Sequence, residues 1–161
     1  NLMLAYLRES NTSQSVIDIF NDLDQKLERE LFRKLFPVIL TDNGSEFSNP
    51  KAIEYGPYQN GTLRTYIYYC DAGSPHQKGA IEVNHSLIRR VLPKGTCFNN
   101  LEQEDITRMM NHINSYKRKK LNNRSPYETF SFYHGEEVLH KLGCSPVAAD
   151  DILLKPTLLK R

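Results

Sequence analysis

The stretch Pro37-Val38-Ile39-Leu40-Thr41-Asp42-Asn43-Gly44 indicates the fold class. Its apolar and β-branched core, residues 38–41, predicts a central strand buried on both faces, and the three polar residues after it predict a turn. Ligands of open α/β sheets collect beyond the carboxyl ends of such strands, so Asp42 is the first candidate for a functional residue. A second interpretation stays open here, in which Asp42 only stabilises the turn through its side chain.

Helical and strand patterns alternate on both sides of this strand. Residues 2–7 form an apolar run that predicts a buried strand, and apolar residues at spacings of three and four predict one helix over residues 13–35. Residues 65–70 predict a second strand, whose alternating tyrosines are expected in the core and which also ends in an acid, Asp71. Further helices are predicted over residues 77–92, 101–116 and 136–142, with another starting at Ser125. The alternation predicts an α/β fold with a mainly parallel sheet.

Length and composition narrow the function classes. The chain has 161 residues, of which 39% are hydrophobic and 25% are charged, as expected for one ordinary domain. Its three cysteines have neither the spacing of a zinc site nor that of a disulfide framework, and no apolar run approaches the roughly 20 residues of a membrane span. These features predict a cytoplasmic protein without a membrane partner.

Charge is unevenly distributed along the chain. Residues 62–125 contain 11 Lys and Arg against 5 Asp and Glu, whereas the remaining residues contain 10 against 14. A basic middle, including the run Lys117-Arg118-Lys119-Lys120, suggests a polyanionic partner such as nucleic acid. A merely solvated charged face is the alternative explanation.

The predicted helix over residues 77–92 presents an acid among bases. On a helical projection one face is apolar apart from Asn84, and the side chains near Glu82 on the other face are His85, Ser86, Arg89 and Arg90. Two carboxylates, Asp42 and Glu82, would suit a hard divalent cation such as Mg²⁺ or Mn²⁺, and two such ions support phosphoryl transfer. An ordinary solvated helix face is the alternative for Glu82.

Several motifs together resemble a known family. They are Thr41-Asp42-Asn43-Gly44-Ser45-Glu46-Phe47, the segment from Tyr69 to Glu82 with its Gly-x-x-Glu, Pro93-Lys94-Gly95-Thr96, Asn114 to Lys119, and Arg124-Ser125-Pro126-Tyr127-Glu128-Thr129-Phe130. In combination they resemble the catalytic core of DDE transposases, above all the insertion-sequence thirty family, whose cores are similar to retroviral integrases. The resemblance covers about residues 2–130.

The resemblance implies a ribonuclease H-like fold with a central mixed sheet flanked by helices. It implies that Asp42 and Glu82 are catalytic residues and ligands of Mg²⁺ or Mn²⁺, with two ions in the complete enzyme. The DNA-binding residues that it suggests are His76, Lys78, Arg89, Arg90, Lys117, Arg118, Lys119 and Lys120. The implied partners are DNA, as transposon ends and target, and further copies of the protein, and the implied location is the nucleoid.

One departure from the family pattern affects the expected activity. The family carries a first aspartate on the first strand of the sheet, and no early acid of this chain follows a predicted strand. We therefore expect an amino-terminally truncated core over residues 1–130, with its first strand or strands missing, followed by a helical extension and tail over residues 131–161. The chain by itself is expected neither to nick nor to join DNA. A catalytically inert DNA-binding or oligomer-forming remnant is the alternative, and a plain ribonuclease H-type nuclease ranks third.

Overall fold

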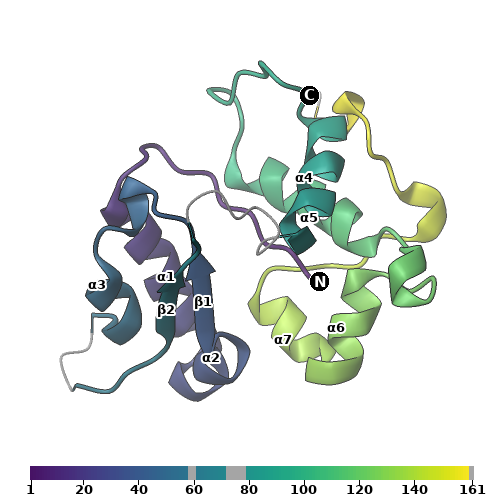
Figure 1. Ribbon diagram of the computed structural model, residues 1–161. Coiled ribbons are helices and arrows are strands. Elements are labelled where there is room, and N and C mark those ends of the chain that lie inside the picture. The colour runs from purple at the N-terminus through teal and green to yellow at the C-terminus, as the bar shows by residue number, and fades with distance from the viewer. Residues whose placement is uncertain (58–60, 72–78, 160–161) are drawn as a thin grey trace. The chain divides into compact units, whose positions relative to one another are not determined.

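The computed structural model describes residues 1–57, 61–71 and 79–159, with only the backbone described for residues 79–83 (Figure 1). The chain divides into two compact units. We call residues 8–77 the sheet unit, and residues 78–161 together with residues 1–7 the helical unit.

The sheet unit contains two parallel strands, which confirms the predicted α/β class and the parallel pairing. Its elements are α1 (Ser13–Leu27), α2 (Arg29–Leu35), β1 (Val38–Thr41), a 3₁₀ turn (Ser45–Phe47), α3 (Pro50–Tyr55) and β2 (Tyr66–Tyr69) (Figure 1). The register runs from Val38 opposite Tyr66 to Thr41 opposite Tyr69. Parallel pairing places the carboxyl ends of both strands at the same edge of the sheet.

Within the described residues of the sheet unit, one face of this sheet is packed. Ile39 and Ile67 contact the core formed by Val16, Ile17 and Ile53, which come from α1 and α3. The other face carries Val38, Leu40, Tyr66 and Tyr68, each about half exposed. The prediction that β1 is buried on both faces, and that the tyrosines of β2 lie in the core, is therefore wrong. Apolar composition alone does not distinguish a strand covered on two faces from one covered on a single face.

The predicted helix over residues 13–35 is broken at Glu28, which has a φ of 63°. Asp24, buried within α1, binds Arg29 at 3.0 Å and Arg64 at 3.1 Å. In one continuous helix Arg29 would point about 140° away from Asp24, because each residue advances by about 100°. The break therefore brings the guanidinium of Arg29 to the buried carboxylate of Asp24. The periodicity of apolar residues does not reveal this ion pair.

Arg64 is the polar centre of the sheet unit. It is 1% exposed, and its guanidinium donates to the backbone carbonyls of Ile53, Phe20 and Ala52 at 2.6, 3.3 and 3.3 Å. Burial lowers the pKa of Arg64, and the hydrogen bond to Asp24 opposes this shift. One side chain thus joins α1, α3 and the segment entering β2.

The helical unit is built around the long helices α4 and α5. Its elements are α4 (Gly79–Val91), α5 (Gln103–Ser115), α6 (Pro126–His134), α7 (Glu136–Lys141) and 3₁₀ turns at Lys119–Leu121, Ala149–Asp151 and Pro156–Leu159 (Figure 1). Its main apolar cluster consists of Leu87, Val91, Ile106, Met109, Met110 and Ile113. The predicted start at Ser125 is confirmed, because Ser125 and Glu128 form a reciprocal capping box with Pro126 at the first helical position.

The predicted strand over residues 2–7 is wrong. This segment has no strand partner among the described residues, and its backbone instead bonds to side chains of α5. Asn114 accepts from the Met3 amide at 3.0 Å and donates to the Met3 carbonyl at 2.8 Å, while Gln103 accepts from the Leu7 amide at 2.8 Å. Asn114 is fully buried. Its side-chain amide satisfies both backbone polar groups of Met3, as the backbone of a neighbouring strand would do. No helix in the described part of the chain is long and apolar enough to cross a bilayer.

Candidate functional site: an acidic turn and a basic surface

Asp42 lies directly after β1, in the turn at the carboxyl edge of the sheet. Its side chain is exposed, and its Oδ1 accepts from the Gly44 amide at 3.3 Å. Asp71 follows β2 at the same edge and is also exposed. The structure therefore gives Asp42 a turn-stabilising contact and also places a second acid at the edge where α/β proteins bind ligands.

The turn after β1 is attached to β2 at several points. The Cys70 amide donates to the Thr41 carbonyl at 2.7 Å, and Asn43 donates to the Cys70 carbonyl at 3.4 Å. The Tyr69 hydroxyl donates to the Phe47 carbonyl at 2.6 Å. These bonds hold the segment that carries Asp42 against the end of the neighbouring strand.

Gly44 marks a place where two carboxylates converge. A Cβ built on Gly44 would lie 2.5 Å from Glu46 Oε2 and 3.1 Å from Asp42 Oδ1. Gly44 has φ −63° and ψ 146°, which any residue can adopt, so its lack of a side chain matters for space and not for backbone freedom. Glu46 was not singled out by the sequence, because only the path of the turn brings its carboxylate over Gly44.

The donor set at this turn fits the divalent cation that the resemblance implies. Carboxylate oxygens are the ligands that Mg²⁺ and Mn²⁺ prefer, and oxygens of Asp42 and Glu46 both lie where a side chain added at Gly44 would meet them. Within the described residues no three His, Cys, Asp or Glu side chains form a group that could hold a metal ion. Asp42 and Glu46 would thus supply part of a coordination shell.

Helix α4 carries the other predicted acid. Position 82 lies in the first half of α4, and the side chain of Glu82 is outside the described residues, as are His76 and Lys78. Further along α4, Asn84, Leu87 and Val91 are buried, whereas His85, Ser86, Arg89 and Arg90 are exposed. The predicted division of this helix into a packed and a basic face is therefore confirmed for its described side chains, including Asn84 on the packed face. Asp42 belongs to the sheet unit and Glu82 to the helical unit.

The predicted basic run forms an ordered turn between α5 and α6. The Arg118 amide donates to the Arg124 carbonyl at 3.0 Å, and the Asn123 amide donates to the Arg118 carbonyl at 3.1 Å. Asn122 and Asn123 have φ of 54° and 60°, a conformation that asparagine tolerates better than most residues. We call residues 117–124 the basic turn.

The cations of the basic turn differ in exposure. Lys117, Lys119 and Lys120 are exposed, as is Arg124. Arg118 is half-buried, donates to the Ile113 carbonyl at 3.5 Å, and has its pKa lowered by burial. Among the predicted DNA-binding residues of this turn, the three lysines are therefore accessible and Arg118 braces the turn.

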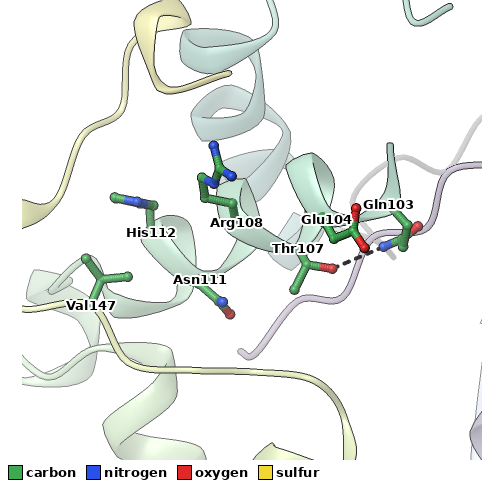
Figure 2. A pocket seen from close by; sticks show the side chains of 7 residues that line it. All are labelled: Gln103, Glu104, Thr107, Arg108, Asn111, His112 and Val147. Carbon is green, nitrogen blue, oxygen red and sulfur yellow. Dashed lines mark hydrogen bonds between the residues drawn. The ribbon is translucent and has the colours of Figure 1, made fainter. Parts of the chain in front are cut away.

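A cavity of about 390 Å³ lies on α5, away from the basic turn. Figure 2 shows its lining residues, Gln103, Glu104, Thr107, Arg108, Asn111, His112 and Val147, with Gln103 hydrogen-bonded to Thr107. His112 accepts from the Leu153 amide at 3.1 Å, and burial together with Arg108 lowers its pKa, while Asp151 raises it. Acids and bases are mixed here, so the cavity is not selective for one sign of charge.

Comparison with known proteins gives a consistent set of relatives. A putative integrase, ORF3, of Spiroplasma virus SpV1-R8A2 B is 37% identical over 122 residues, which are 76% of this chain and 35% of that protein. The transposase for insertion sequence element IS4351 of Bacteroides fragilis is 31% identical over 98 residues, covering 61% of this chain and 28% of the transposase. The transposase InsI for IS30A of Escherichia coli K12 is 36% identical over 62 residues, 38% of this chain and 16% of that protein.

The chain thus spans about a third or less of the length of these curated relatives. No family model matches the chain, and no solved structure matches it. The relatives confirm the resemblance to transposases and integrases, with IS30 elements among them.

Proposed function

Because the chain is related to transposases that include those of IS30 elements, we propose that it is part of a metal-dependent DNA strand transferase with a ribonuclease H-like core. The substrate is DNA, as transposon ends and target, and the protein works as an assembly of several copies. The observation that carries the proposal is the exposed carboxylate of Asp42 at the carboxyl edge of a parallel sheet, with Glu46 beside it across Gly44.

Asp42 and Glu82 are the proposed metal ligands, and Glu46 supports Asp42 from the same turn. These carboxylates would hold Mg²⁺ or Mn²⁺, which would supply activation of an attacking oxygen and stabilisation of the leaving oxygen of a phosphodiester. The bonds from Asn43 and Tyr69 to neighbouring backbone hold the turn, so Asp42 is positioned before a metal arrives. Such preorganisation spares the cost of ordering the ligand at the moment of binding.

The exposed cations have a separate task in this proposal. Arg89 and Arg90 on α4, and the lysines of the basic turn, contact the phosphate backbone and hold the DNA in register. Such contacts supply affinity without reading sequence, and they weaken as salt rises. His76 and Lys78, which precede α4 in the sequence, are proposed to approach the DNA strand.

Metal titration tests the carboxylate assignment. Calorimetric titration of the chain with Mn²⁺, in the presence of a DNA duplex, is expected to show binding that Asp42→Ala and Glu82→Ala each abolish. Asp18→Asn, an exposed acid of α1, and Glu137→Gln, an exposed acid of α7, are matched controls that should leave the titration unchanged. Equal losses in the controls and in the two test variants would contradict the assignment.

A second candidate is a DNA-binding or oligomer-forming protein without catalysis. The exposed lysines of the basic turn favour it, because they can hold DNA with no metal present. DNA binding that persists alongside a complete absence of Mn²⁺ binding would support this candidate over a strand transferase.

A further inference from the structure

We propose that the basic turn and two aromatic residues of α6 form one surface that binds unpaired DNA bases, an inference that rests on the proposed function and specifies the form of DNA bound. The surface consists of Lys117, Lys119, Lys120, Arg124, Phe132 and Tyr133. Its expected ligand is a single strand, or the frayed end of a duplex, and not a fully paired helix.

The four cations of this surface lie in a stretch of the sequence without acids. No Asp or Glu occurs between Asp105 and Glu128 in the sequence. The Glu128 carboxylate accepts from the Ser125 amide at 2.7 Å, so it is engaged in capping α6. The four cations of the surface form no ion pair within the described part of the chain. An anionic backbone would therefore meet exposed cations, and the exposed acids nearest to them in the sequence are Glu128, Glu136 and Glu137 on α6 and α7.

The aromatic part of the surface lies on the exposed side of α6. Phe132 is 74% exposed and Tyr133 is 71% exposed, the highest values among the large apolar side chains of the described residues. Their ring centroids are 5.2 Å apart at an interplanar angle of 86°, an edge-to-face pair. Pro126 and Tyr127 are the buried residues of this helix, so its packing rests on side chains other than the exposed rings.

Arg124 joins the two parts. Its guanidinium carbon lies 5.9 Å from the centroid of Phe132, within the range of a cation–π contact. The same residue closes the basic turn through its bridge to Arg118. Phosphate-binding groups and ring faces are thus adjacent on one ordered surface.

This combination selects unpaired bases. Stacking requires access to the flat face of a base, which neighbouring base pairs cover inside a duplex. Proteins that bind single strands combine a basic groove with exposed aromatic side chains, and such stacking tolerates any base because every base has a π face. The lysines alone would bind paired and unpaired DNA with little distinction.

The test compares the full chain bound to three labelled DNAs: a 20-nucleotide single strand, a blunt duplex, and a duplex with an unpaired end. The variant Phe132→Ala/Tyr133→Ala is expected to lose about tenfold or more in affinity for the single strand and the unpaired end, with little change for the blunt duplex. Its salt dependence should match that of the unmodified chain. Lys119→Gln/Lys120→Gln should weaken binding to all three DNAs and reduce the salt slope by about two.

Two further variants control the comparison. Phe132→Trp should retain the single-strand preference, because it keeps a stacking face. Phe98→Ala removes an exposed aromatic of the same unit outside the surface and should change none of the affinities. Thermal unfolding verifies that each variant is folded.

The outcomes separate this inference from the proposed function. Equal affinity of the double alanine variant and the unmodified chain for single strands would overturn the inference alone. A change of oligomeric state in that variant, with DNA binding unaffected, would also overturn it by assigning the rings to contact between copies. No binding to any of the three DNAs would overturn the proposed function together with the inference.

Discussion

The sheet unit and the helical unit place their positive charges in opposite environments. In the sheet unit Arg64 is 1% exposed, pairs with buried Asp24 and donates to three backbone carbonyls. In the helical unit Lys119 and Lys120 are exposed and lie in a stretch without acids. The buried cation fixes how elements pack around β2, whereas the exposed cations contribute little to packing and remain accessible to a polyanion. Charge therefore serves structure in one unit and recognition in the other.

The largest expected effect tests the buried cation. Arg64→Met should destabilise the protein by about 3–5 kcal/mol, because it leaves Asp24 buried with only part of its compensation and removes donors from three carbonyls. Urea unfolding monitors the change. Arg33→Met, at an exposed arginine of α2, is the control and should stay within about 0.5 kcal/mol. Similar losses in both variants would remove the distinction between buried and exposed cations.

A smaller loss is expected at Asn114 in the helical unit. Asn114→Ala leaves the amide and the carbonyl of Met3 without their partner and should cost about 1–3 kcal/mol. Unfolding measurements against Asn100→Ala, an exposed position, check the value. If residues 1–7 were attached by apolar contacts alone, the two variants would behave alike.

Gly44→Ala should change stability by less than about 0.5 kcal/mol, because its backbone angles suit alanine and the nearest atoms belong to the flexible Glu46 side chain. The added methyl should nevertheless displace the Glu46 carboxylate from Asp42 and weaken Mn²⁺ binding. Calorimetry and thermal unfolding of the same sample separate the two effects. Unchanged Mn²⁺ affinity would show that the space between these carboxylates is not used by the metal.

The smallest expected effect is a pH dependence at His112. Its pKa is lowered in the folded state from the ordinary value of 6.5, so the unfolded chain binds more protons in the interval between the two values. The resulting stability is present above pH 6.5 and is lost as the pH falls through that interval. His112→Asn retains an acceptor for the Leu153 amide, and its Tm should fall less between pH 7.5 and pH 5 than that of the unmodified chain.

Local signals in the sequence were sufficient to predict the position of several elements. Pro126 with the capping pair Ser125 and Glu128 located the start of α6, and the alternation of apolar and basic positions located the faces of α4. The parallel pairing of β1 and β2 followed from strand and helix alternation. The start of α6 and the faces of α4 depend on residues within one or two turns of one another, whereas the strand pairing joins residues 28 positions apart.

The predictions that were wrong depend on distant partners. The break at Glu28 brings Arg29 to Asp24, a buried carboxylate that also pairs with Arg64 from 40 positions along the chain. In the segment of residues 2–7, Met3 bonds to Asn114, which lies 111 positions further along the chain. The apolar composition of this segment would be the same in a strand, so composition alone could not show the difference. At the candidate site, Asp42 was found from its place after a strand, but the proximity of Glu46 depends on the path of the turn around Gly44.

We propose that Asp42 and Glu82 are both ligands of divalent cations, and metal-directed cleavage tests this assignment most directly. Fe²⁺ is also held by carboxylate oxygens, and with ascorbate and peroxide it cuts the backbone close to where it is bound. With DNA present, we expect cleavage both within residues 41–47 and near residue 82, with excess Mg²⁺ suppressing the two sets of cuts in parallel. Cleavage at only one of these segments, or cuts that Mg²⁺ does not suppress, would contradict the assignment of both residues as metal ligands.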